Sequence, residues 1–284
     1  MLGTAAGGGL PQWNCGCSNC ARARSGELPA RTQSSAAFTP DGVRWYLIDA
    51  SPDVARQLAS LAPPVGRASP LAGVLLTDAE FDHTLGLLQL REGSTWTLHA
   101  TPGVHTMLQD QFPAVRLLER YAQVDTVTVQ PGQPHEFGGV SVTWVALDTH
   151  TPRYHHARRP EAAATCALRI QGPRHVLAYA PSLSDLQTGP ARALLEEADI
   201  LLVDGTFYRG DELIRLKFGT DDAQSMGHLP MQDSAPLLAT LKAGVKRYTH
   251  LNNTNPALDP ASPERAWIRG QGLDLIDDGW ETEL

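Results

Sequence analysis

The stretch LLTDAEFDHTLGLL, residues 75–88, places four ionisable side chains between two apolar runs. Asp78, Glu80, Asp82 and His83 fall within six residues, directly after an apolar run that is typical of a buried strand. Carboxylates crowded together repel one another unless a positive group lies among them. The stretch therefore predicts a strand-to-helix turn that either holds a cation or forms a solvated acidic loop, with Asp82 as a helix N-cap.

Outward from this turn, short apolar strands alternate with turns and a few helices. Strands are predicted at 43–51, 71–78 and 95–102, two strands at 125–148, and a hairpin at 165–182. A short helix is predicted at 82–92, and Pro102 can open another. Helix and strand alternate over 190–207 and 234–251, and a last helix has Ser262 as N-cap and Pro263 at its first position.

The order of these elements predicts an α+β fold in one domain. No internal repeat and no low-complexity linker divides residues 1–284. A chain with 42% hydrophobic residues can bury a sizeable core. We expect a sandwich of two mixed β-sheets with helices on both outer faces.

Charge and terminal composition exclude several classes of function. The net charge is −8 and no basic tract stands out, so a nucleic-acid partner is not expected. The N-terminus has neither the basic region nor the long apolar region of a signal peptide, and no apolar run is long enough to cross a bilayer. The sequence therefore predicts a soluble, cytoplasmic protein.

Three of the four cysteines lie in the segment CGCSNC, as Cys15, Cys17 and Cys20. Thiolates at this spacing can bind one Zn²⁺ tetrahedrally when the fold supplies a fourth ligand. Buried or reactive cysteines without metal are the alternative, and a disulfide is less favoured in a reducing compartment. We expect a structural zinc site at 15–20, whereas Cys166 lies in a strand pattern typical of a core residue.

The acidic turn resembles the usual signature of the metallo-β-lactamase superfamily. That motif is T-H-x-H-x-D-H-x-x-G after a buried strand, and this chain has T-D-x-E-x-D-H-x-x-G from Thr77. In the superfamily, the first two histidines hold one metal and the Asp-His pair helps to hold the other. Because Asp78 and Glu80 replace those histidines here, the resemblance implies one metal site, built around Asp82 and His83.

Longer strings extend the resemblance almost from end to end. LGTAAGGGLPQWNCGCSNC, ARTQSS, DASPD, LLTDAEFDHTLGLLQLREG, LLVDGTF, MGHL and HLNNTNPALDPASPERA occur in this order. Together they are similar to the coenzyme PQQ (pyrroloquinoline quinone) synthesis protein B family, within the metallo-β-lactamase αββα sandwich fold. The match is weak over about 103–165.

The resemblance implies the metal ligands. His250, at the end of a late strand, corresponds to the last metal histidine of the superfamily. The place of the bridging aspartate is held by Pro181 and Ser182. The remaining set, Asp82, His83 and His250, is the two-histidine, one-carboxylate set of non-haem Fe(II) oxygenases, with open positions for O₂ and substrate.

The family resemblance implies an iron-dependent oxygenase that hydroxylates the tyrosine ring of a Glu-Tyr-derived precursor on the way to PQQ. Its partners are then a small-molecule or dipeptide precursor and O₂, and a homodimer is left open. An older family label implies a carrier that transports PQQ or its precursor to the periplasm. A metal-dependent hydrolase is a further alternative, which the loss of both leading histidines disfavours.

A second acid–histidine pair is expected to serve catalysis. Asp204 and His228 resemble the Glu-His pair of the tRNA-processing branch of the superfamily, in which it donates a proton. A carboxylate that holds an imidazole fixes its tautomer and raises its pKa. Asp78 and Glu80 are expected to orient His83 or His250, or Glu80 to bind a weaker second ion.

The resemblance also suggests residues around the substrate and the zinc. Trp13 and Asn14, beside the cysteines, and Arg31 and Gln33 in ARTQSS are expected to line the pocket. A related phosphodiesterase branch supplies a histidine as fourth zinc ligand where this chain has Asn253. Asn253, a water or a redirected His250 remain the alternatives for that position. The other histidines, including His150 and His156, receive no role.

Overall fold

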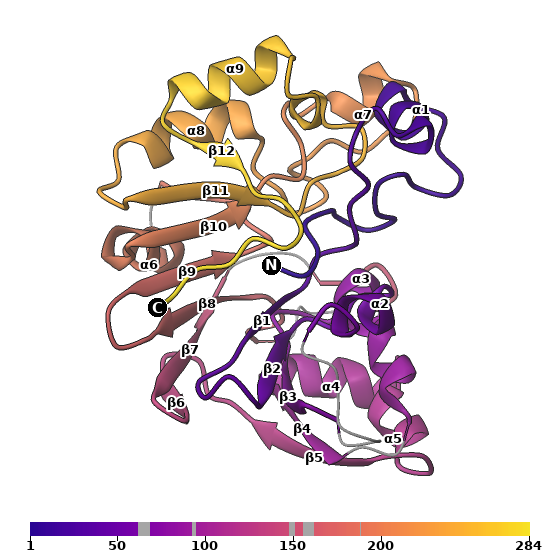
Figure 1. The fold of residues 1–284 in the computed structure, drawn as a ribbon, viewed down its shortest axis with the longest axis vertical. Helices are drawn as coiled ribbons and strands as arrows, with labels where there is room; N and C mark the ends of the chain where they lie inside the picture. The colour runs from indigo at the N-terminus through magenta and orange to yellow at the C-terminus, as the bar shows by residue number, and fades with distance from the viewer. Residues whose placement is uncertain (62–68, 93–94, 148–150, 156–161, 188) are drawn as a thin grey trace.

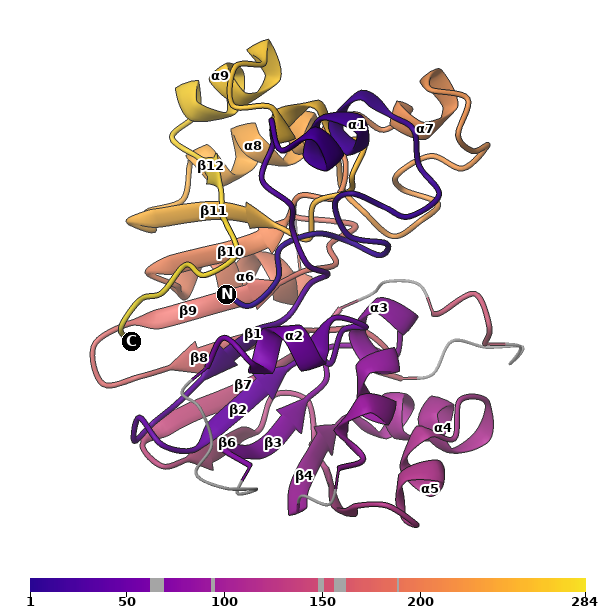
Figure 2. The same ribbon diagram turned by 45° about the vertical axis from the view of Figure 1, so that its right-hand side comes forward.

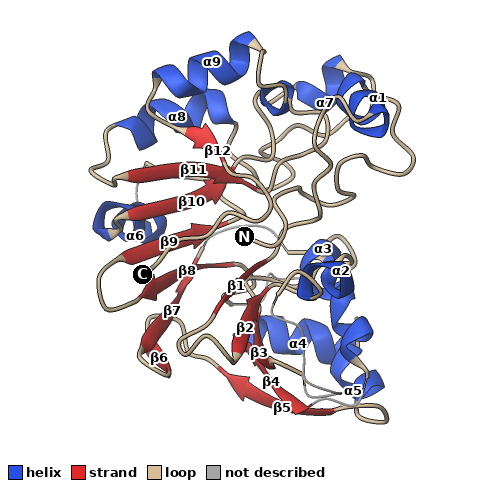
Figure 3. Ribbon diagram, in the orientation of Figure 1, coloured by secondary structure: helices blue, strands red, loops and turns tan. Residues whose placement is uncertain are grey.

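Two β-sheets pack face to face, and helices cover the outer side of each (Figures 1 and 3). This is the arrangement of a computed structural model that describes residues 1–284 except 62–68, 93–94, 148–150, 156–161 and 188. His150 and His156 lie outside the described residues. The predicted αββα sandwich is confirmed.

The first sheet has the strand order β1-β2-β3-β4-β5, with β1 antiparallel to β2 and the others parallel. Its strands are β1 (Ala36–Phe38), β2 (Trp45–Ile48), β3 (Leu71–Leu75), β4 (Thr95–Ala100) and β5 (Gln123–Thr128). Its helices are α2 (Val54–Leu58), α3 (Phe81–Thr84), the 3₁₀ helix η1 (Leu85–Leu90), α4 (Pro102–Asp110) and α5 (Ala114–Leu118).

The second sheet has the order β12-β11-β10-β9-β8-β7-β6, antiparallel from β6 to β9 and parallel from β9 to β12. Its strands are β6 (Pro134–Phe137), β7 (Val140–Ala146), β8 (Cys166–Gln171), β9 (Val176–Ala180), β10 (Ile200–Asp204), β11 (Val245–Thr249) and β12 (Asp274–Leu275). The accompanying helices are α6 (Gly189–Glu197), α7 (Glu212–Arg215), α8 (Met231–Ala239), the 3₁₀ helix η2 (Pro256–Leu258) and α9 (Pro263–Gly270).

Alternation along the strands divides the apolar side chains among three layers. Leu75 and Leu202 point into the core between the sheets, while their neighbours Val74 and Leu201 face the helices on either side. Trp144 is buried in the central layer, and its indole N–H donates to Leu76 O at 2.9 Å. This bond ties the two sheets together beside the acidic turn.

One stretch contains more strands than the sequence predicts. Residues 125–148 were predicted as two strands around Pro/Gly turns, but the described part of this segment contains β5, β6 and β7. β5 is the edge strand of the first sheet, whereas β6 and β7 form a hairpin in the second. The turn at Pro131 and Gly132 therefore carries the chain from one sheet to the other.

The N-terminal segment crosses between the halves of the molecule before it reaches the first sheet (Figure 2). Ala5 forms bridges with both Gln33 and Leu251, and α1 (Ser18–Ser25) follows. The parallel strands β3, β10 and β11 end nearby: His83 lies in the helix α3 that follows β3, Asp204 is the last residue of β10, and His250 directly follows β11. Carboxyl ends of parallel strands are the usual place for a site in α/β sheets. Among the described residues no helix is long and apolar enough to cross a membrane.

Candidate metal centre

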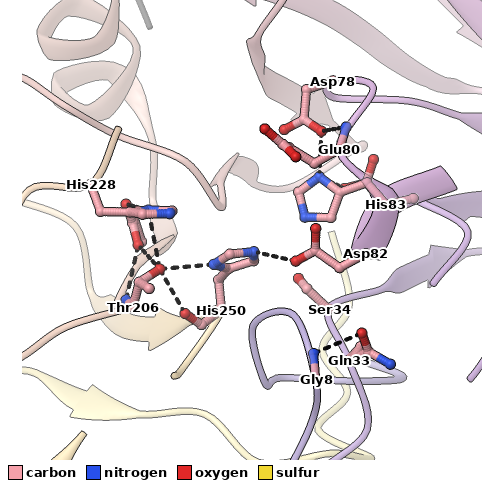
Figure 4. Close-up of polar contacts among 12 residues, drawn as sticks. Gly8, Gln33, Ser34, Asp78, Glu80, Asp82, His83, Thr206, His228 and His250 are labelled. Atoms are coloured by element: carbon pink, nitrogen blue, oxygen red, sulfur yellow. Dashed lines mark hydrogen bonds and ion pairs between the residues drawn. The ribbon is translucent and has the colours of Figure 1, made fainter. Parts of the chain in front are cut away.

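Three predicted ligands from opposite ends of the chain meet between the sheets. One potential ligand atom from each of Asp82, His83 and His250 lies within 4.8 Å of the others. The side chains of Asp82 and His83 enter from α3, and His250 enters from the end of β11 (Figure 4). The rings of His83 and His250 stand 5.2 Å apart at 81°, so the two imidazoles approach a common point edge to face.

His83 has one nitrogen fixed and the other free. Its Nδ1–H donates to Asp78 Oδ1 at 2.8 Å (Figure 4). Its Nε2 is buried and has no hydrogen-bond partner among the described residues. A buried nitrogen without a partner is costly unless something binds it, and a metal-bound histidine ordinarily donates its other N–H to a carboxylate. His83 thus fits a metal ligand.

His250 is fixed in the same way, through a hydroxyl. Its Nδ1 lies 2.8 Å from Thr206 Oγ1, and its Nε2 lies 3.2 Å from Asp82 Oδ2 (Figure 4). The backbone at His250 is left-handed, with φ of 55°, which is uncommon for a residue other than glycine and often marks a functional site. The residues present therefore suit a divalent cation held by two imidazoles and one carboxylate.

Buried charges around the turn shift several ionisation equilibria. Burial opposes the charged form of His83, but neighbouring carboxylates outweigh burial and hold its pKa well above the ordinary value. These carboxylates belong to Asp78, Asp49 and Asp82. Burial likewise opposes the charged form of Asp82, yet the two histidines hold the pKa of its carboxyl well below its usual range. Asp82 is thus ionised, as a metal ligand must be.

Asp49 is a member of the site that sequence reasoning did not identify. It is fully buried and accepts bonds from the Thr77 amide and hydroxyl, at 2.9 to 3.0 Å. Its Oδ2 lies 3.9 Å from His83 Nδ1, and burial raises the pKa of its carboxyl to about 7. The segment DASPD, which contains Asp49, matches the family. The contact of Asp49 with Thr77 and His83 arises only when β2 and β3 become neighbours in the sheet.

The predicted pair of Asp204 and His228 is brought together behind His250. His228 Nδ1 lies 2.7 Å from Asp204 Oδ2, and the rings of His228 and His250 stack with centroids 5.5 Å apart. Burial opposes the charged form of His228, but the charge of Asp204 outweighs it and raises the pKa of the imidazole. One potential ligand atom from each of Asp204, His228 and His250 lies within 4.8 Å of the others. Thr206 Oγ1 lies within hydrogen-bond distance of all three side chains.

The cysteine cluster is assembled around Asn253. One sulfur from each of Cys15, Cys17 and Cys20 lies within 4.8 Å of the others. The Asn253 side-chain amide approaches the three sulfurs at 3.0, 3.6 and 3.3 Å. A half-turn of the Asn253 amide would bring its oxygen to the same place. Three thiols around one point suit a single Zn²⁺. Both ring nitrogens of His250 face elsewhere, toward Thr206 and Asp82.

The four residues expected to bind substrate lie in different surroundings. Trp13 is 87% exposed and Asn14 bonds to Gln12, so both lie on the outer side of the cysteine loop. The Arg31 guanidinium is buried and donates to Thr4 Oγ1, Ile276 O and Asp277, which favours a structural role. Gln33 accepts from the Gly8 N–H at 3.0 Å (Figure 4). It therefore holds residues 7–9, the glycine loop, beside the metal ligands.

Asp78 and Glu80, the two acids at the histidine positions of the superfamily signature, differ in their contacts. Asp78 accepts from the Glu80 amide as well as from His83, so its carboxylate orients the histidine. Glu80 is half-buried, and its side chain lies beside Asp78 and His83 (Figure 4). Neither belongs to a metal-ligand group among the described residues.

Comparisons with known proteins agree with this geometry. A family model for the beta-lactamase superfamily domain matches residues 44–251. The fold and this match define the chain as a metallo-β-lactamase-fold protein. Coenzyme PQQ synthesis protein B from Klebsiella pneumoniae (strain 342) is 39% identical over 303 residues, covering 100% of this chain and 97% of that protein. Its counterpart from Methylorubrum extorquens (strain PA1) is 38% identical over 301 residues, covering 100% of this chain and 99% of that protein. The chain belongs to the coenzyme PQQ synthesis protein B family.

A solved structure supports the same placement. The crystal structure of Zn(2+)-bound PqqB from Methylobacterium extorquens superposes with a TM-score of 0.91 at 37% identity, covering 100% of this chain and 98% of that chain. Metal binding therefore accompanies the fold in a relative of nearly equal length.

Proposed function

We propose that this protein is an iron-dependent oxygenase of PQQ biosynthesis. Its substrate would be a small precursor derived from a Glu-Tyr unit, and its product the ring-hydroxylated tyrosine. The observation that carries the proposal is the convergence of Asp82, His83 and His250, together with a buried nitrogen of His83 that has no partner in the part of the chain that the structure describes. Two histidines and one carboxylate leave open positions on a divalent metal, as in non-haem Fe(II) oxygenases.

Bound Fe(II) would supply a place where O₂ and substrate meet and electrons move between them. The chain's own residues would do the rest. Asp78 and Thr206 would keep the two imidazoles directed at the ion, through the bonds to His83 and His250. His228, with its Nδ1 held by Asp204, would hold or deliver a proton at the phenolic oxygen of the substrate.

Two features favour this proposal over a two-metal hydrolase. Pro181 and Ser182 stand where the superfamily has its bridging aspartate. Asp78 is committed to His83 and the Glu80 amide, so it does not replace the missing histidine as a ligand. A carrier of PQQ would need a pocket but no converging set of metal ligands.

The test is anaerobic reconstitution with Fe(II), followed by a Glu-Tyr dipeptide, O₂ and ascorbate as a two-electron donor. Ring hydroxylation consumes one O₂ and two electrons and yields one water, so product and O₂ uptake should match. Asp82→Ala should abolish product. The exposed control Asp41→Ala should retain full activity, because every hydrogen bond of its carboxylate to a described residue stays within its own turn. The absence of a hydroxylated ring, or full activity in Asp82→Ala, would refute the oxygenase.

We further propose that Cys15, Cys17, Cys20 and Asn253 hold a structural Zn²⁺. Cys17→Ser should lower the zinc content by one equivalent per chain and leave the iron content unchanged. Cys166→Ser is the matched control, since Cys166 is buried in β8 away from the cluster. Metal analysis after gel filtration gives both values. Loss of iron instead of zinc from Cys17→Ser would contradict the assignment.

A further inference from the structure

Thr206 lies at the centre of the hydrogen bonds behind the metal ligands. Its hydroxyl is buried and contacts four atoms (Figure 4). These are Asp204 Oδ1 at 2.7 Å, His250 Nδ1 at 2.8 Å, His250 O at 3.0 Å and His228 Nδ1 at 3.1 Å. A hydroxyl has one hydrogen to donate and two lone pairs to accept with, so these contacts constrain one another.

The hydrogen of the Thr206 hydroxyl is committed to an acceptor. The carboxylate of Asp204 accepts from the Leu183 amide, the Thr206 amide and His228, and such an environment favours its ionised form. Asp204 Oδ1 is the nearest of the four atoms and only accepts. The other oxygen in contact, His250 O, can also only accept. The hydrogen of the Thr206 hydroxyl therefore points to an oxygen, and neither imidazole nitrogen receives it.

His250 must therefore donate at Nδ1. A nitrogen lone pair facing the oxygen lone pairs of Thr206 at 2.8 Å would be repulsive, whereas Nδ1–H makes a good hydrogen bond. The neutral imidazole then carries its lone pair on Nε2, which faces Asp82 Oδ2 at 3.2 Å. A lone pair and a carboxylate oxygen at that distance need a cation or a proton between them.

We propose that Thr206 is a positioning residue that fixes the tautomer and orientation of His250 for metal binding. The threonine occupies the place that a carboxylate takes behind many metal-bound histidines, and Asp204 acts through it. The same hydroxyl fills the space among Asp204, His228 and His250, so that buried group needs no ion of its own. This inference rests on the proposed metal centre and names a residue that acts upon it.

The test compares substitutions of similar shape at two neighbouring buried threonines. Thr206→Val removes the hydroxyl, and Thr206→Ser keeps it. Thr249→Val is the matched control, because Thr249 is equally buried, adjoins His250 and has a hydroxyl without a partner among the described residues. Each full-length protein, with its cysteine site filled by Zn²⁺, is titrated anaerobically with Fe(II) by calorimetry, and Asp82→Ala serves as the blank.

We expect Thr206→Val to weaken Fe(II) binding about 10- to 100-fold, and Thr206→Ser and Thr249→Val to stay within about threefold of wild type. Histidine ¹⁵N resonances should show a protected Nδ1–H of His250 in wild type and Thr206→Ser, and its loss in Thr206→Val. Wild-type affinity in Thr206→Val would overturn the inference and leave the metal centre standing. Equal binding by wild type and Asp82→Ala would overturn both.

Discussion

Gly7 marks a position where a single methyl group would reach the proposed metal ligand. A Cβ at this residue would lie 3.3 Å from Asp82 Oδ2, closer than most such contacts. Since Asp82 also contacts His250, its carboxylate has little room to retreat. We expect Gly7→Ala to shift the carboxylate by a few tenths of an ångström and to weaken Fe(II) binding several-fold.

The measurement for Gly7→Ala is the same anaerobic Fe(II) titration. Gly244→Ala is the control, because a Cβ there meets no described atom within 4 Å and Gly244 lies at the opposite end of β11 from His250. Unchanged affinity in Gly7→Ala would mean that the glycine loop does not constrain Asp82.

His99 offers a pH-dependent test of the core between the sheets. Burial, followed by the charges of His135 and His105, lowers the pKa of His99 to about 4 from 6.5. Its ring packs against Phe137, and its Nδ1 is buried without a partner among the described residues. Below pH 6.5 the unfolded chain takes up a proton at this residue that the folded protein refuses, so stability falls toward pH 4.

We therefore expect His99→Gln to remove this part of the acid sensitivity. The free-energy difference between wild type and variant, from urea unfolding at pH 7.5, 6, 5 and 4, should shift in favour of the variant as the pH falls. Parallel curves would show that His99 titrates alike in both states.

The sequence could identify the metal ligands, but not the residues that contact those ligands and hold them in place. Asp82, His83 and His250 follow from a motif and a strand end, because their order along the chain resembles a known family. Thr206 and Asp49 contact histidines 44 and 34 residues away. Their role depends on which strands become neighbours, and one sequence carries no direct record of that.

Elements with explicit end signals were the ones most closely predicted. The helix α9 begins at Pro263, where Ser262 Oγ accepts from the Arg265 amide at 3.0 Å, as expected. Helix α4 begins at Pro102. In contrast, α1 was not foreseen, because its N-cap is Cys17 and its segment is organised by the cysteine cluster. Short α2, α5 and α7 also lack a distinct apolar period.

At the scale of one helix, the N-cap of α9 gives a quantitative test. Ser262→Ala leaves the Arg265 amide without its acceptor, and loss of such a cap costs about 0.5–2 kcal/mol. Ser262→Asp keeps an acceptor and should stay near wild type. Urea unfolding measures the difference. Equal stability of Ser262→Ala and wild type would show that solvent satisfies this helix end equally well.

At the scale of the whole molecule, the two ends of the chain are hydrogen-bonded to each other beside the site. The Gly279 amide donates to Met1 O at 2.8 Å, and the Met1 ammonium contacts Trp280 O. The same C-terminal segment supplies Asp277 to the buried guanidinium of Arg31. The segment therefore holds in place the first residues of the chain, which lead to the glycine loop.

Asp278 is the residue through which this closure can be tested. Its carboxylate accepts from Thr4 Oγ1 at 2.6 Å and from the Thr32 amide at 2.8 Å. Asp278→Ala leaves both partly buried donors without an acceptor, so we expect a loss of about 1–3 kcal/mol in the free energy of unfolding. Glu283→Ala, which breaks an exposed ion pair with Arg174, should change the stability very little. If Asp278→Ala also weakens Fe(II) binding and Glu283→Ala does not, the closure of the termini supports the metal centre through the glycine loop. If both variants unfold like wild type, the two ends contribute no stability to each other.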